Sequence, residues 1–287
     1  MDFWKDYLIG VISGGISKTF TTPIDAIMRV PRIAKTAQPR KGQQAIVNVL
    51  QIKANEVSSL WRGNLINMLR YCPIQGYYFA LKAAFKKNDI LYPHNPNPTI
   101  FYQFMVNTTS GSLAGFTSLA IMYPIINGPY FASGHYYYLK TDQPPPGLYN
   151  SISSRYKGFT LTSIDVIIYR GLYFGINDTL AILNPYQNIS TCNSFISLMS
   201  KYMQAHISVH LANTCSYPIH TIRKRLVMTS EKEMYKNGFD CLIKIITKEG
   251  FFSLFHGIRI NQFRQNIGPS IGLVSFGELQ RLVAVEE

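Results

Sequence analysis

The chain has 287 residues, of which 47% are hydrophobic, and it carries 28 Lys and Arg residues against 15 Asp and Glu, a formal net charge of +13. This charge does not indicate nucleic-acid binding, because the basic residues interrupt and flank apolar stretches of helix length. Anionic lipid headgroups or an anionic solute are better partners for such an arrangement. The four cysteines form no CxxC pair, so neither a zinc site nor a disulfide framework is indicated.

The first hundred residues predict two helices. Residues 7–29 are largely apolar but contain Lys18, and a lone lysine in a membrane-length helix is expected to face a cavity or a partner. A polar stretch follows, with a short amphipathic segment at 45–54. A second apolar helix then carries Arg70 and ends near Lys86.

Four further helices are predicted at residues 101–127, 161–183, 198–228 and 260–283. The loop 130–155 contains a tyrosine cluster and a proline run that cannot continue a helix, and residues 239–246 form an amphipathic stretch. Spans of about 20 mostly apolar residues match the thickness of a bilayer core. We therefore expect an all-α membrane protein with six transmembrane helices and both termini on one side.

Prolines inside apolar helices recur about every 100 residues, at Pro23, Pro124 and Pro218, and such a recurrence indicates an internal repeat. Each proline is expected to kink its helix, because it has no N–H to donate and its ring collides with the preceding turn. The sequence thus predicts three repeats of two helices each, which together form one structural domain. Their boundaries are 1–98, 99–190 and 191–287.

A second signal fixes the register of the repeats. In each one, an aromatic-x-Gly turn precedes a charged position by the same interval, which pairs Gly63 with Arg70, Gly158 with Asp165, and Gly257 with Arg264. Two arginines and an aspartate are therefore expected at equivalent levels of three equivalent helices. A salt bridge from both arginines to the aspartate is the structural alternative to a role in ligand binding.

These motifs resemble the mitochondrial carrier family, whose three repeats each carry a Pro-x-acid-x-x-base sequence, and within it the ADP/ATP carriers. The resemblance covers nearly the whole chain. The stretches that carry it are Ile16-Ser17-Lys18-Thr19, Leu60-Trp61-Arg62-Gly63-Asn64-Leu65, Ile167-Ile168-Tyr169-Arg170, Tyr173-Phe174-Gly175-Ile176 and Arg223-Lys224-Arg225. It implies a threefold barrel of six tilted helices around a central cavity, in the mitochondrial inner membrane.

The resemblance also implies two kinds of site. The residues that it implies for nucleotide binding are Lys18, Arg70, Tyr169, Ser216, Arg223, Arg225 and Arg264, in agreement with the need of phosphate groups for several convergent cations. The turns at Gly63, Gly158 and Gly257 are similar to the family's cardiolipin sites, where helix N-termini face lipid phosphate. No cofactor is implied. His206 and His210 have a metal-ligand spacing, but no acid or cysteine joins them, so no metal is expected.

The chain departs from the family in the two rings of ion pairs that close the cavity from either side. On the proline side the six positions are Asp25, Met28, Ile126, Pro129, His220 and Arg223; on the other side they are Ala83, Lys86, Asp178, Ala181, Gly277 and Gln280. Each ring keeps one acid and one base. Asp165 is a further departure, because the family's ADP/ATP carriers have a glycine there, and a carboxylate is expected to block the cavity or neutralise its cations.

These departures favour a chain that has lost transport and serves as an accessory subunit of a larger inner-membrane complex, of the respiratory-chain type. A transporter needs two conformations of similar energy, and depleted gates remove the interactions that balance them. The expected partners are then cardiolipin and other inner-membrane lipids, together with the subunits of that complex. The alternative is an active, divergent ADP/ATP antiporter. No enzyme motif is present, so catalysis is not expected.

Overall fold

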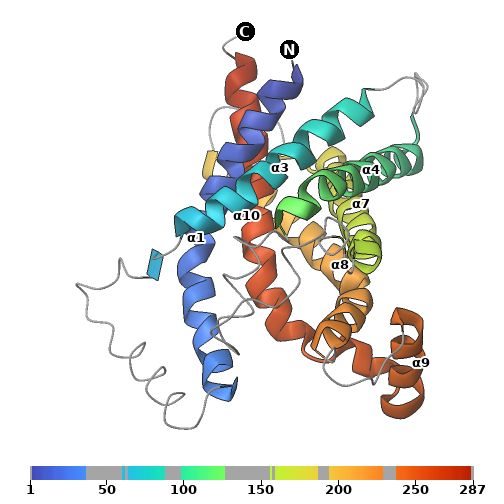
Figure 1. The fold of residues 1–287 in the computed structure, drawn as a ribbon. Helices are drawn as coiled ribbons and strands as arrows, with labels where there is room; N and C mark the ends of the chain where they lie inside the picture. Colours follow the sequence, from blue (N-terminus) through green and yellow to red (C-terminus); the bar gives the residue numbers. More distant parts are fainter. Residues whose placement is uncertain are drawn as a thin grey trace.

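The computed structural model describes residues 2–36, 60–61, 64–87, 98–126, 156, 159–186, 194–228 and 237–285, and these residues contain helices but no strand (Figure 1). The predicted segment 45–54 and the loop 130–155 lie outside them. The helices are α1 (Asp2–Thr36), α3 (Asn64–Lys86), α4 (Ile100–Ile126), α7 (Phe159–Leu183), α8 (Ser194–Met228), α9 (Gly238–Glu249) and α10 (Ile258–Val285), with a short 3-10 turn η3 (Phe251–Phe255). The all-helical class is confirmed for this part of the chain.

The six long helices correspond to the six predicted from apolar runs, and α9 corresponds to the predicted amphipathic stretch. The largest difference is in α1, which starts five residues earlier than expected and continues through Pro31 to Thr36. A proline removes one backbone hydrogen bond and bends a helix without forcing it to end, so the end expected near residue 29 was wrong.

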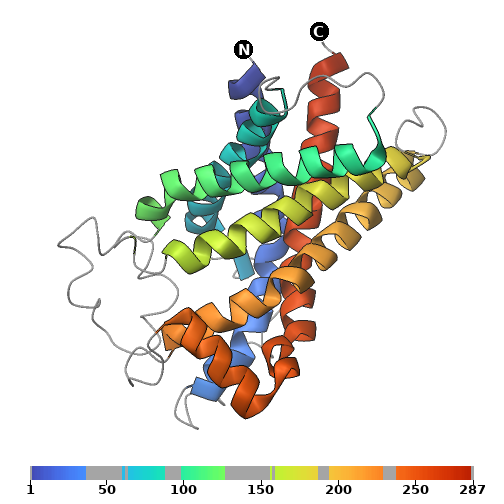
Figure 2. The ribbon, with the colours of Figure 1, turned by 90° about the vertical axis from the view of Figure 1, so that its right-hand side faces the viewer.

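The long helices form a closed ring in chain order. Each packs against the next along the chain, and α10 packs against α1. The two termini lie side by side at one end of this ring, and α9 lies at the other end, beside α8 and η3 (Figures 1 and 2). Both ends of the described chain thus lie at the same end of the ring, and their location on one side of a membrane stays a prediction.

Small residues allow the helices of the ring to approach closely. A Cβ atom on Gly10 of α1 would lie 2.8 Å from the Cα atom of Gly76 in α3, closer than any ordinary carbon contact. On the other side of α1, the Ser17 hydroxyl donates a hydrogen bond of 2.6 Å to the carbonyl of Gly268 in α10. In a bilayer the hydrophobic effect does not drive helices together. They associate through close packing at small residues and through hydrogen bonds between helices, as here.

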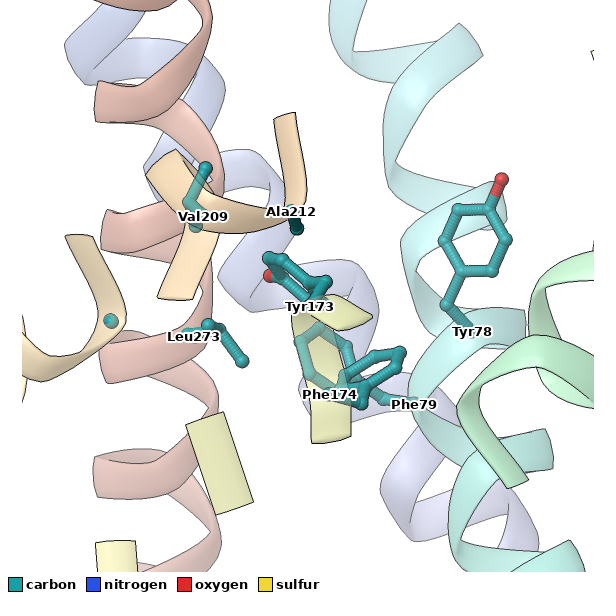
Figure 3. Packing of buried hydrophobic residues seen from close by; sticks show 8 residues of the cluster. Tyr78, Phe79, Tyr173, Phe174, Val209, Ala212 and Leu273 are labelled. Carbon is teal, nitrogen blue, oxygen red and sulfur yellow. The ribbon is translucent and has the colours of Figure 1, made fainter. Parts of the chain in front are cut away.

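A cluster of buried apolar side chains fills the centre of the ring (Figure 3). Its members come from α3, α7, α8 and α10, and they are Tyr78, Phe79, Tyr173, Phe174, Ala205, Val209, Ala212 and Leu273. Phe79 stacks on Phe276 with ring centroids 3.9 Å apart and meets Phe174 edge-on. We call this group the central cluster. It closes the interior on the side of the termini.

We expect Gly10→Ala to lower the stability of the ring, because the added methyl group meets backbone atoms of α3 that cannot move aside without separating the helices. The loss should be about 1–3 kcal/mol, typical of overpacking, and is measured as a fall in the melting temperature of the purified protein. Gly277→Ala is the matched control, since a Cβ there meets nothing within 4 Å. Equal melting temperatures for the two variants would contradict the packing argument.

Candidate functional site

A cavity of about 350 Å³ lies inside the ring, on the side of the central cluster that faces away from the termini. Its wall includes the later half of α1, the first halves of α7 and α10, the second half of α8, and Tyr71 of α3. The Tyr173 hydroxyl of α7 donates a hydrogen bond of 3.2 Å to the carbonyl of Pro269 in α10, across the floor of the cavity. This volume is at the lower end of the range for small-molecule sites.

Lys18 and Tyr169, two residues predicted to bind nucleotide, lie in the cavity wall. The Lys18 ammonium lies over the ring of Tyr71, 4.3 Å from its centroid. Ser216, also in the wall, is buried, with only 4% of its surface exposed. The side chain of Arg264 is not among those described, and Arg70, expected at the same level, is exposed and is not part of the cavity wall.

Arg170 is a cavity residue that was not predicted. It is 7% exposed, donates from Nη2 to Oε1 of Gln75 at 3.1 Å, and has its guanidinium 3.7 Å from the ring centroid of Tyr78. Its Nη1 has no hydrogen-bond partner among the described residues. The rule that singled out Lys18, a lone cation within an apolar helix, applies equally to Arg170 and could have found it.

The Asp165 carboxylate contributes to the wall and lies 3.9 Å from the Arg223 guanidinium of α8. The sequence offered a salt bridge of Asp165 with Arg70 and Arg264 as the structural alternative. Among the described side chains, Asp165 pairs with Arg223 on α8, the neighbouring helix in the ring; the Arg264 side chain lies outside those described, so its pairing with Asp165 stays a prediction. At 3.9 Å the two groups attract each other electrostatically but lie beyond the range of a good hydrogen bond.

Arg225 does not belong to the cavity, although it was assigned to the nucleotide site with Arg223. Its Nη2 donates to Glu249 of α9 at 2.6 Å and to the Ser253 hydroxyl at 3.3 Å. Two residues along a helix correspond to a rotation of about 200°, so Arg223 and Arg225 face nearly opposite directions. Arg225 therefore points towards α9, whereas Arg223 points towards Asp165 of α7.

On the terminal side, the two charges that remain from the gate are paired with each other. Lys86 of α3 lies 3.7 Å from Asp178 of α7, and Lys82, one turn before Lys86, approaches the same carboxylate to 2.6 Å. Ala83 and Ala181, at the neighbouring gate positions, have no charge to offer. The gate is depleted, but its surviving acid and base form an ion pair between two helices.

Two further contacts, one of them from the predicted gate position Gln280, complete this end of the ring. Lys201 of α8 forms an ion pair of 2.5 Å with Glu278 of α10, and Gln280 of α10 donates to Asp6 of α1 at 3.0 Å. Glu278 lies one residue after the gate position Gly277. One residue turns a side chain by about 100° around the helix, and Glu278 accordingly points towards α8. Together with Lys82, Lys86 and Asp178, these residues form what we call the terminal latch.

The proline-side gate is described only in part. Asp25 and His220 line the cavity, and Arg223 pairs with Asp165. The side chains of Met28 and Ile126, and Pro129 altogether, lie outside the described residues.

Among the three turns expected to bind cardiolipin, only Gly257 is described. It has a φ of +83°, a conformation that favours glycine, at the start of α10. Gly63 and Gly158 lie outside the described residues. His206 and His210 lie against Ser270 and Asn266 of α10, at 3.5 and 3.2 Å.

Within the described residues, one helix, α7, is long and apolar enough to cross a membrane by length and composition. The described residues thus form a ring of helices around a cavity whose wall includes two cations, Lys18 and the buried Arg170.

Comparison with known proteins identifies the family. The family described as "Mitochondrial carrier protein" matches residues 1–90 and 195–286, and the chain belongs to the mitochondrial carrier family. It is 34% identical over 306 residues to mitochondrial substrate carrier family protein ancA of Dictyostelium discoideum, with 99% of this chain and 94% of the relative covered.

Two further relatives are named as ADP/ATP carriers. The chain is 34% identical over 310 residues to the ADP,ATP carrier protein of Parachlorella kessleri, with 99% and 86% of the two chains covered. It is 32% identical over 302 residues to ADP/ATP translocase 3 of Bos taurus, with 99% and 98% covered. The family consists of transporters rather than enzymes in general.

The contact between α8 and α9 should depend on pH. Hydrogen bonds from Arg225 and Ser253 lower the pKa of Glu249 from 4.5 to about 2, so this contact stabilises the fold above pH 4.5 and is lost as the pH falls towards 2. We expect wild type to melt higher than Glu249→Gln at pH 6, with the difference shrinking below pH 4.5. Asp240→Asn, which removes an i,i+4 pair with Lys244 within α9, should have a smaller effect at pH 6, because that pair does not join α9 to another helix. A difference that does not change with pH would contradict this assignment.

Proposed function

We propose that this chain is a multi-pass carrier of the mitochondrial inner membrane that binds a nucleotide of the ADP/ATP type in its cavity and exchanges it across the membrane. The observation that carries the proposal is Arg170, a buried cation in the cavity wall whose Nη1 has no hydrogen-bond partner among the described residues. A buried donor on a charged group is costly to leave unsatisfied. A phosphate oxygen is the natural acceptor for it.

The surroundings of Arg170 support phosphate binding. Gln75 accepts a hydrogen bond from Arg170 and donates one to the Tyr71 hydroxyl. The Lys18 ammonium lies over the ring of Tyr71. Residues of α3 thus hold two cations, one from α1 and one from α7, at fixed positions on one side of the cavity. Convergent, preorganised cations bind a phosphate chain without the cost of ordering them first. The ring of Tyr169, beside Arg170, offers a surface on which a base can stack.

The terminal latch and the central cluster support alternating access. A carrier must close one end of its cavity while the other is open, with interactions that can be broken and re-formed at similar energy. The latch contains four charged or polar contacts in three helix pairs, which link α3 to α7, α8 to α10, and α10 to α1. Opening this end requires breaking them. Although several motif positions have lost their charge, other charged residues contribute to the contacts at this end of the ring. The gate is therefore less depleted than its motif positions alone indicate.

A second candidate is the accessory subunit of a larger inner-membrane complex, of the respiratory-chain type, that no longer transports. The contact between Asp165 and Arg223 favours it, because it engages the one base that remains at the proline-side gate positions. In such a complex, lipid contacts at the turns of Gly63, Gly158 and Gly257 would include cardiolipin, held by helix N-termini. The two candidates share the fold and differ in whether nucleotide crosses the membrane.

Nucleotide binding should depend on Arg170. We expect ADP and ATP to raise the melting temperature of the purified protein, and Arg170→Gln to weaken the apparent affinity at least about tenfold, as loss of a charge-assisted hydrogen bond does. Arg225→Gln is the matched control, since Arg225 lies outside the cavity and its loss should leave affinity unchanged. The absence of any shift in wild type with purine nucleoside di- and triphosphates, GDP included, would overturn the binding proposal. Shifts without exchange in liposomes would favour the accessory subunit.

The terminal latch should stabilise the state that is closed at the termini. Asp178→Asn leaves Lys82 and Lys86 facing each other without their acid, and removing one partner of a buried pair costs about 3–5 kcal/mol. We expect a lower melting temperature and altered exchange of labelled nucleotide in liposomes. Adding Lys82→Met to the same variant should recover part of the stability, because it removes a charge left without its partner. No recovery would argue against the pairing.

A further inference from the structure

We propose that Asp165 and Arg223 form a base-reading pair that selects guanine nucleotides over adenine nucleotides. This inference rests on the proposed function, since it concerns the base of a nucleotide held in the same cavity. It assigns a binding role to Asp165, which the sequence analysis expected to block the cavity or neutralise its cations.

The charged groups in and beside the cavity are divided between two sides. Asp165 belongs to the cavity wall, and its partner Arg223 lies beside that wall. Arg170 turns towards α3, where it meets Gln75 and Tyr78, whereas Asp165 turns towards α8, where it meets Arg223. Both start from α7, so the two charges of opposite sign lie on different sides of one helix. A nucleotide has the same division, because its phosphates are anionic and its base is neutral.

The charge of Asp165 orients such a ligand. A carboxylate repels phosphate oxygens, so the phosphate chain is directed to Lys18 and Arg170 and the base to the side of Asp165. Asp165 and Tyr169 are four residues apart and therefore lie on one face of α7, one turn from each other. A base stacked on the Tyr169 ring would present its edge to Asp165.

Asp165 and Arg223 are placed to receive that edge. Asp165 supplies two acceptor oxygens, and Arg223 supplies N–H donors. Their separation of 3.9 Å leaves room for a ligand to bond to each of them. The Arg223 side chain is also 41% exposed, so it can adjust to a ligand more readily than the buried Arg170.

Guanine matches this pair better than adenine does. The edge of guanine presents an acceptor, O6, followed by two adjacent donors, N1–H and the 2-amino group. Arg223 can donate to O6 while both oxygens of Asp165 accept from the two donors. Adenine presents one donor, its 6-amino group, beside one acceptor, N1, so one carboxylate oxygen gains no partner. Sites that must satisfy buried polar groups discriminate strongly against ligands that leave one unpaired.

The test compares GDP, IDP and ADP, because IDP differs from GDP only in lacking the 2-amino group. We expect GDP to bind the purified full-length protein at least about tenfold more tightly than IDP or ADP, the discrimination typical of one good bidentate contact to a base. Affinities are measured by calorimetry or from the dependence of melting temperature on ligand concentration.

Two variants assign the preference to Asp165. In Asp165→Asn, which keeps the shape but loses the charge and one acceptor, the preference for GDP over IDP should fall below about threefold. Ile164→Ala changes the adjacent residue, which is exposed on the outside of α7, and should leave the preference unchanged. A preference for GDP that persists in Asp165→Asn would overturn the inference.

The failure of this inference differs from the failure of the proposed function. If ADP binds wild type as tightly as GDP, the base-reading role of Asp165 is wrong while nucleotide binding stands. If none of the three nucleotides binds, both fall together.

Discussion

A buried guanidinium group joins three helices of the ring. Arg170 extends from α7 to Gln75 and Tyr78 of α3, and its own Cβ lies against α4 at Gly115, where a methyl group would come within 2.9 Å. Because a buried charge needs compensation from every side, the positions of α3, α4 and α7 depend on one another here. The tyrosine rings around Arg170 place its charge against the negative faces of aromatic groups. The cavity, its floor and its cations all rest on this contact.

The interior has two unlike halves. On the terminal side lie packed aromatic rings and the latch; on the other side, cations, acids and amides surround a cavity. The same helices make both halves, since α3, α7 and α10 each pass from polar residues to aromatic ones along their length. One end can therefore be held shut by apolar packing while the other remains able to accept a charged solute.

Much of the fold could be predicted from the sequence, because each long apolar run is a helix and the amphipathic stretch before Gly250 is α9. The exact end of α1 could not be predicted, because a proline in the sequence suggests the end of a helix, whereas α1 continues through Pro31 to Thr36. Among the described residues, hydropathy recovers α7 alone as a membrane span. Other helices carry polar side chains that pack inside the ring, such as Asn107 and Ser118 of α4.

The site could be predicted less completely than the fold. Lys18 and Tyr169 were predicted from sequence motifs. Arg170 could have been predicted as well, because it is a lone cation within an apolar helix, as Lys18 is. The periodicity of a helix separates Arg223 from Arg225, so their different directions could also have been anticipated. The partners in the latch could not, because Lys201 with Glu278 and Gln280 with Asp6 are far apart in sequence and no spacing rule predicts contacts across a ring.

The bond from Arg225 to Glu249 and Ser253 has a mechanical meaning beyond its contribution to stability. It fastens the far end of α8 to α9, a short helix whose inner face, Cys241 and Ile245, is already buried against Ile222 and Leu254. At this end, α8 and α9 are therefore joined by both charged and apolar contacts. Any tilt of α8 would therefore carry α9 with it, together with the exposed apolar side chains of α9, Phe239 and Ile243.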